Sequence, residues 1–291
     1  MRITTNAMAR NLLLRLDTVN RRALEFQEQL ASGKRINKPS DDPVGANRAF
    51  RLRTSIAEVE RYVKNVGDSK DWLLATEEAL RQMVDAMHRV GELANSAATS
   101  TVPASSLDAI AKELEQIQEH LVFLANSDHG GRFLFAGQNT LTQPFTAAGP
   151  AGVLDFGAIQ REVGPGQTMR INITPEFLDG PNSVLALVPQ VSSLVKAGDF
   201  KAVGDMLTAI QAETDELLSY VSETGAKINR LDMISQRLTE SNSSLTRLLS
   251  DTEDAEFDQI ILKLSQEEAS YQAALAVGAR LIQPTLVDFL R

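Results

Sequence analysis

The sequence predicts a mainly α protein: a long antiparallel, coiled-coil-like helical bundle built from both chain ends, with a small β-rich domain inserted in the middle. Three observations support this. Apolar residues recur in alternating steps of three and four along most of the 291 residues. Charged breaks interrupt the repeat near each end, and the repeat disappears between about residues 132 and 189. Only 5% of the residues are aromatic, which suits helices that pack along their length.

The first helix is predicted over residues 1–32. Burying its apolar positions completely would contribute about 10–20 kcal/mol, whereas ordering the backbone costs about 1–2 kcal/mol per residue. We therefore expect this helix and its C-terminal counterpart to be disordered in the monomer and to order on association. The repeat consists of Met8, Leu12, Leu16, Val19, Ala23, Phe26 and Leu30.

The stretch "ASGKRINKPSDDP", residues 31–43, forms the first break. Gly33 is expected to cap the first helix at its C-terminal end. Pro39 keeps the connection extended, because a residue that precedes proline is disfavoured in helix. Asp42 is expected to be the N-cap of the next helix, with Pro43 at its first position.

The inner helices follow the same repeat over residues 73–97, 107–124 and 203–249. A second break, "SDTEDAEF", mirrors the first and places acidic residues at the start of a last helix, where the helix dipole favours them. The seam of this last helix is expected to have no partner within the monomer. Its members are Phe257, Ile261, Leu264, Tyr271, Leu275 and Ile282, followed by Leu286 and Phe289.

Short strands are expected in the middle of the chain, at "RFLFAG", "GVLDFG" and "TMRINIT". In the last of these, Met169, Ile171 and Ile173 alternate with polar residues, as in a half-buried strand. The pattern divides the chain into three domains. They are a terminal coiled-coil domain of residues 1–42 plus 253–291, a helical bundle of residues 43–137 plus 190–252, and a β-rich outer domain of residues 138–189.

Charge is distributed unevenly. Residues 1–66 carry 13 Lys/Arg and 7 Asp/Glu, a net charge of 13 − 7 = +6, and residues 212–291 carry 7 and 14, a net charge of 7 − 14 = −7. Docking of the two ends is therefore electrostatically favourable; two solvated faces are the simpler alternative. The chain contains no cysteine, which excludes disulfides, thiolate catalysis and Cys-ligated zinc. We expect no membrane span and no cleaved signal peptide, because apolar runs of the required length are absent.

Candidate chemical sites are weak. His88, His120 and His129 match no metal-ligand spacing. Gly33-Lys34 resembles a phosphate loop only superficially, because neither Ser nor Thr follows the lysine. Basic residues of the first helix lie beside an apolar stripe without aromatic stacking partners, so a solvated or partner-facing surface is favoured over nucleic acid; they are Arg10, Arg15, Arg21 and Arg22. We expect no enzyme activity and no cofactor, metal, nucleic acid or membrane.

Three segments resemble the flagellin family. "ASGKRINKPSDDPVGANRA" resembles the family's N-terminal turn segment, "VGELANSAATST" its Arg-Glu-Leu-Ala segment with Gly91 in place of the usual arginine, and "TGAKINRLD" its C-terminal Gly-Ala-Arg-x-Asn-Arg-Leu-Glu segment. Together they cover nearly all of the helical part. The opening "MRIT", the segment "GGRFLFAGQNTLTQPF" and the tail "IQPTLVDFLR" resemble the hook-associated members more than filament flagellin.

This resemblance implies a structural protein of the junction between flagellar hook and filament, exported without a cleaved signal peptide. The implied partners are neighbouring axial proteins, further copies in a ring, and a cytoplasmic export chaperone on the C-terminal helix. The terminal helices would form an inner layer, and the apolar seams at both ends would be the assembly surface. The alternatives are filament flagellin itself, a secreted helical effector or tip protein, and, least favoured, an enzyme.

Overall fold

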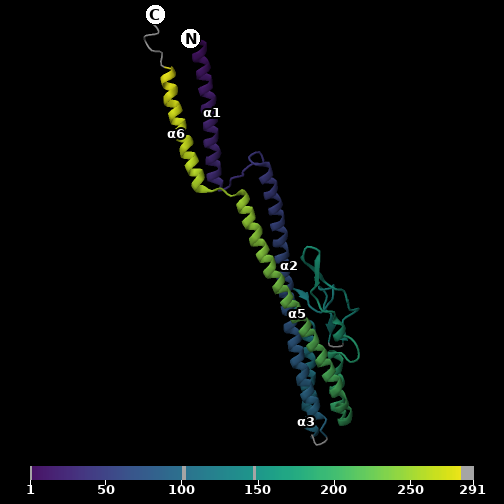
Figure 1. The fold of residues 1–291 in the computed structure, drawn as a ribbon. Coiled ribbons are helices and arrows are strands. Elements are labelled where there is room, and N and C mark those ends of the chain that lie inside the picture. The colour runs from purple at the N-terminus through teal and green to yellow at the C-terminus, as the bar shows by residue number, and fades with distance from the viewer. Residues whose placement is uncertain (1, 100–102, 147–148, 283–291) are drawn as a thin grey trace. The chain divides into compact units, whose positions relative to one another are not determined.

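The computed structural model describes residues 2–99, 103–146 and 149–282, and over these residues the protein is mainly helical (Figure 1). The helices are α1 (Arg2–Ser32), α2 (Pro43–Ala97), α3 (Ala104–Ala125), α4 (Val184–Ala197), α5 (Phe200–Glu253) and α6 (Phe257–Ile282). The strands are β1 (Asp128–His129), β2 (Arg132–Phe133), β3 (Phe145–Thr146), β4 (Gly149–Pro150), β5 (Gln160–Gly164) and β6 (Gln167–Arg170), and a 3-10 turn spans Pro175–Leu178. None of the described helices is long and apolar enough to cross a bilayer.

The chain divides into two compact units. Unit 1 combines both ends of the sequence, residues 1–58 and 241–291, and unit 2 is the continuous stretch of residues 59–240. The long helices α2 and α5 each begin in one unit and end in the other. This is the fold class that the sequence predicts, with helices from both chain ends and a small β-rich part between them.

In unit 1, α1 and α6 lie side by side and run in opposite directions (Figure 1). Ile260 is the most deeply buried apolar residue of α6, at 5% exposure. Near the other end of α6, a Cβ on Gly278 would come within 2.7 Å of Leu12 Cδ2, so the two helices approach closely there. Arg22 of α1 also pairs with Glu267 of α6 at 3.5 Å.

The core of unit 2 is formed where α2, α3, α4 and α5 pack together. The repeat identified in the sequence supplies its centre, because Leu80, Met83, Leu114, Leu121 and Leu217 are all fully buried. Sequence periodicity therefore placed the buried faces of these helices correctly.

A second, smaller apolar cluster involves residues 59–73 of α2 and residues 228–238 of α5. Here Val163 and Met169 of the β5–β6 hairpin contact Tyr62, Leu73 and neighbouring apolar residues of the helices. The hairpin is antiparallel, with Arg161 opposite Met169 and an irregularity between Glu162 and Gly164. The β-rich part is thereby fixed to the helices by its own apolar side chains.

The predicted strands are shorter than expected. "RFLFAG" is a strand only at β2, and "TMRINIT" only as far as Arg170. Met169, Ile171 and Ile173 are all buried as predicted, but Asn172 is buried as well. Its side chain accepts the Ile159 N–H and donates to the Gly157 carbonyl, both at 2.8 Å. Side-chain hydrogen bonds therefore replace the expected strand ladder at this point.

The expectation of a strand at "GVLDFG" is wrong. Asp155 accepts hydrogen bonds from the backbone N–H groups of Gln138, at 2.9 Å, and of Gly157, at 2.8 Å. An aspartate that binds nearby backbone donors stabilises a turn in place of a strand. The segment forms no strand for this reason.

Helix α4 begins at Val184, inside the stretch where the helical repeat was expected to be absent. The helix contains Pro189, which cannot donate a hydrogen bond to the carbonyl of Leu185 four residues earlier. Gln118 of α3 donates its side-chain amide to that same carbonyl at 3.1 Å. The bond that proline removes is thus replaced from a neighbouring helix.

Candidate functional site

The two charged breaks of the sequence meet in unit 1. We call residues 33–42 together with residues 252–256 the connector. Lys34 and Asp254 pair as an antiparallel bridge. On either side of it, the Arg35 N–H donates to the Glu253 carbonyl at 2.7 Å, and the Ala255 N–H donates to the Gly33 carbonyl at 3.0 Å. The segment that follows α1 is therefore held to the segment that precedes α6.

Glu253 is the centre of the connector. The residue is 5% exposed, and its carboxylate is paired with Lys34 Nζ at 2.8 Å and with the guanidinium of Arg53 from α2. A buried carboxylate is tolerated only when it is paired and hydrogen-bonded. The side chain of Glu253, the last residue of α5, therefore links the segment after α1 to helix α2.

Arg35 adds a second link between the same segments. Its guanidinium donates to the Thr252 carbonyl at 2.8 Å and contacts Asp42 Oδ2 at 3.4 Å. The last turn of α5 and the first residue before α2 are thus both bound to one side chain. The Arg35 guanidinium is charged in both contacts, and its partner Asp42 is charged in the second. Hydrogen bonds that involve a charged group are stronger than those between neutral groups.

Asp42 lies where the sequence places the N-cap of α2. Its Oδ1 accepts the Gly45 N–H at 2.9 Å, and this bond, helped by Arg35, lowers the pKa of Asp42. A Cβ on Gly45 would come within 2.4 Å of Asp42 Oδ2 and 2.6 Å of Ile36 Cδ1. Glycine at position 45 therefore allows the cap and the buried Ile36 to occupy their places. Pro43 is the first residue of α2.

Gly33 follows the last residue of α1 and has φ of +71°, a conformation that favours glycine. Its N–H donates to the Gln29 carbonyl at 2.9 Å, as in a helix C-cap. The expectation that Pro39 keeps the connection extended is wrong, because residues 38–41 form a turn in which the Asp41 N–H donates to the Lys38 carbonyl at 3.0 Å. The Asp41 carboxylate stabilises this turn by accepting the N–H groups of Asn37 and Lys38 at 3.1 and 2.8 Å. The Lys38 bond is the main reason that the pKa of Asp41 is lowered.

The predicted seams on α1 and α6 are only partly covered. All five seam positions of α1 named as assembly residues are half-buried; they are Leu12, Leu16, Val19, Phe26 and Leu30. On α6, Leu264 is half-buried, whereas Phe257 and Ile261 are 50% and 53% exposed. Tyr271 and Leu275 are exposed as well. Position 282 ends α6, and the predicted seam residues Leu286 and Phe289 lie outside the described residues.

Helix α1 packs against one side of α6, but most of the predicted seam remains exposed, namely Phe257, Ile261, Tyr271 and Leu275. That this seam finds its partner only on assembly stays a prediction. Sequence reasoning missed Ile260 and Gly278, the two residues of α6 that are buried among those whose side chains the structure describes. A glycine inside an apolar helix, which signals close approach, was the available clue. Several large apolar side chains of α6 remain exposed beside this contact, among them Ile261 and Leu275.

Glu253, Arg35 and Arg53 were also missed as site residues. The clue was the opposite net charge of the two chain ends, but a charge sum does not say which residues meet. Lys34, suggested only superficially as part of a phosphate loop, is engaged with Glu253. Of the basic residues of α1, Arg22 faces α6 through Glu267.

The histidines do not come together. His129 packs edge-on against Trp72 with ring centroids 6.3 Å apart, and His120 stacks on Phe123 at 6.4 Å. His88 is exposed on α2. In the part of the chain that the structure describes, no group of three or more His, Asp and Glu side chains is arranged to hold a metal ion.

Comparison with known proteins agrees with this architecture. Residues 3–140 match the family model described as the bacterial flagellin N-terminal helical region. Flagellar hook-associated protein 3 of Escherichia coli K12 is 23% identical over 300 residues, covering 94% of this chain and 95% of that protein. The chain is a relative of the flagellins and the hook-associated proteins.

Two further comparisons extend this relationship. The crystal structure of Bacillus cereus FlgL is 27% identical, with a TM-score of 0.61, and covers 69% of this chain and 99% of that one. Flagellin of Bacillus subtilis 168 is 26% identical over 301 residues, covering 97% of both chains. The flagellin-like sequence thus extends over both terminal helices and the connector.

Proposed function

We propose that this protein is a structural protein of the bacterial flagellum that joins the hook to the filament. The observation that carries the proposal is the similarity to hook-associated protein 3 along almost the whole of both chains. The neighbouring hook-associated protein and flagellin are its proposed axial partners, and further copies of the chain complete a ring. The protein acts outside the cell, on the flagellum.

The connector and the half-covered terminal helices support this role. Continuous exposed apolar surface is unfavourable in an isolated soluble protein and marks a surface for association. Phe257, Ile261 and Leu275 of α6 are large apolar side chains that are about half exposed. On assembly, residues 1–42 and 253–291 form an inner layer, residues 43–137 and 190–252 an outer helical layer, and residues 138–189 face solvent.

A deletion strain tests the junction role. Cells without this protein should secrete flagellin into the medium and build no filaments, and the wild-type gene supplied on a plasmid should restore them. Normal filaments in the deletion strain would overturn the proposal.

Filament flagellin is the second candidate, favoured by the full-length similarity to the Bacillus subtilis protein. The two roles differ in self-polymerisation. Purified flagellin should elongate flagellar seeds, whereas a junction protein should add at most a short cap. Long filaments grown from this protein alone would favour the second candidate. A role as a secreted effector or tip protein is less favoured, because the relatives are flagellar proteins.

We also propose that the chain is exported without a cleaved signal peptide and that a cytoplasmic chaperone covers α6 before export. An amphipathic helix with one exposed apolar side suits a helix-in-groove contact. Leu264→Asp should abolish binding to the cognate chaperone in a calorimetric titration. Ser265→Asp adds the same charge at an exposed neighbouring position and should bind normally. Equal affinity of the two variants would remove this seam from chaperone recognition.

A further inference from the structure

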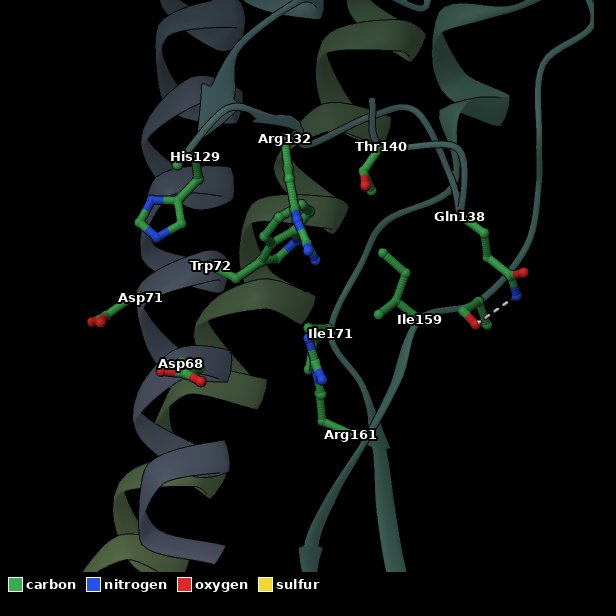
Figure 2. Close-up of a pocket in the computed structure, with 12 residues that line it drawn as sticks. Asp68, Asp71, Trp72, His129, Arg132, Gln138, Thr140, Ile159, Arg161 and Ile171 are labelled. Atoms are coloured by element: carbon green, nitrogen blue, oxygen red, sulfur yellow. Dashed lines mark hydrogen bonds between the residues drawn. The ribbon is translucent and has the colours of Figure 1, made fainter. Parts of the chain in front are cut away.

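A pocket of about 560 Å³ lies entirely within unit 2 and has no part in the assembly surface described above. Asp68 and Trp72 of α2 form one side, and His129 of β1 also lines the pocket (Figure 2). The opposite side is formed by the β-rich part of the chain. Its volume is within the range of sites that bind small molecules.

Two arginines give the pocket its chemical character. Arg132 of β2 and Arg161 of β5 extend toward one another from opposite ends of the pocket (Figure 2). Among the residues that the structure describes, neither has a carboxylate within 4 Å. Asp71 also lines the pocket, but its carboxylate points away from the two guanidinium groups (Figure 2). Guanidinium groups bind carboxylate and phosphate oxygens in a bidentate manner.

The remainder of the lining is suited to hydroxyl groups and to an apolar ring face. Gln138 and Thr140 provide neutral polar groups, and Asp68 provides an acceptor. Ile159 and Ile171 add apolar surface beside them. Gln138 is held in place by donating its amide to the Ala158 carbonyl at 3.1 Å. A simple inorganic anion would use the arginines and would make no use of the Thr140 hydroxyl or the Asp68 carboxylate.

We propose that this pocket binds an acidic sugar, a small polyol that carries a carboxylate or a phosphate. The two guanidinium groups hold the anionic group, and Gln138, Thr140 and Asp68 bond to the hydroxyls. The proposal does not rest on the junction role, because every residue that it uses lies in unit 2.

Trp72 provides a direct measurement. It is the chain's single tryptophan, it lines the pocket, and the residue as a whole is 7% exposed. Titration of the full chain with glucuronate and with glucose 6-phosphate should change its fluorescence in a saturable manner. Tighter binding of glucuronate would indicate that the pocket prefers a carboxylate, and tighter binding of glucose 6-phosphate that it prefers a phosphate. Glucose should not change the fluorescence, because it carries no anionic group.

Variants assign the binding to the pocket. Arg132→Gln and Arg161→Gln should each weaken binding by about tenfold or more, as expected for loss of a charge-assisted hydrogen bond. Arg230→Gln is the matched control, since Arg230 is exposed on α5 and lies outside the pocket. Both pocket variants keep the buried core, and a wild-type far-ultraviolet circular dichroism spectrum would verify that they fold.

Three results would overturn the proposal. One is the absence of any saturable change with either acidic sugar at millimolar concentration. Another is wild-type affinity in both arginine variants. The third is equal affinity for inorganic phosphate and for the sugars, which would leave the hydroxyl-binding groups without a role.

Discussion

Glu253 is the single residue on which the connector depends most, because it pairs with two cations that come from different segments of unit 1. Its isosteric amide keeps the shape but not the charge. Glu253→Gln should therefore weaken both the Lys34 and the Arg53 contact. Since these two cations are about half exposed, we expect a loss of about 1–3 kcal/mol in local stability, below the cost of breaking a fully buried pair.

Amide exchange measures this loss directly. The N–H groups of Arg35 and Ala255 donate across the connector and should exchange faster in Glu253→Gln by about tenfold or more. Glu268→Gln, at an exposed position of α6, should leave both rates unchanged. Rapid exchange of both groups already in the wild-type monomer would show that the connector forms only on assembly, as the predicted disorder of the termini implies.

Glu213 is the residue whose charge opposes folding. It is 8% exposed, and Oε1 has no hydrogen-bond partner among the described residues. Burial, together with nearby Glu216, raises its pKa from 4.5 to about 7, although the Val184 N–H at the start of α4 partly offsets this. Ser183, the N-cap of α4, makes no side-chain capping bond.

The pH dependence follows from the raised pKa. Below pH 4.5 the folded and unfolded chains both hold the proton, so Glu213 costs nothing. Between pH 4.5 and about 7 the unfolded chain ionises while the folded chain resists, and stability falls by an amount on the order of 2–3 kcal/mol. Glu213→Gln should remove this fall in urea unfolding measured across that range. An unchanged pH profile in the variant would assign the dependence to other groups.

At the scale of elements, the contact between α1 and α6 depends on a glycine. A side chain at position 278 would meet Leu12, which explains why a helix-weakening residue occupies this position. Gly278→Leu should separate the helices and reduce incorporation into flagella. Gly278→Ala should be mild, because the clashing atom is the end of a flexible side chain and alanine favours helix.

Ala276→Leu is the control for this prediction, since position 276 is exposed on the same helix. Complementation of a deletion strain, followed by electron microscopy of the cells, compares the three variants. Normal filament numbers with Gly278→Leu would show that close approach at this point is dispensable.

The elements also show how far sequence reasoning reaches. Steps of three and four located the long helices because each must bury one continuous stripe. The caps at Gly33 and Asp42 could be located because capping depends on residues only a few positions apart. The absence of a strand at "GVLDFG" was missed because only one of the two bonds to Asp155 is local: Gly157 lies two residues away, whereas Gln138 lies 17 residues away. Helix α4 was missed because its Pro189 is compensated by Gln118 from another helix.

At the scale of the whole molecule, the two compact units differ in how the chain builds them: unit 1 combines two segments from opposite ends of the sequence, whereas unit 2 is a single segment. Unit 1 needs both chain ends, so its connector could be inferred only as a docking of opposite charges and not as the Glu253 cluster. Unit 2 is one continuous stretch that contains both apolar clusters. We therefore expect unit 2 to fold without residues from the termini.

This leads to a prediction about the fragment of residues 59–240. Because the apolar clusters are complete within it, the fragment should unfold cooperatively and keep the Trp72 fluorescence of the full chain. Leu114→Ala within the fragment should cost about 2–5 kcal/mol, as expected for a fully buried leucine in a fixed core. The fragment should not bind the export chaperone or enter flagella, since it lacks α1, α6 and the connector. An unfolded fragment would show that the inner helices depend on the terminal ones for their stability, and unchanged stability in Leu114→Ala would show that Leu114 does not lie in a fixed core.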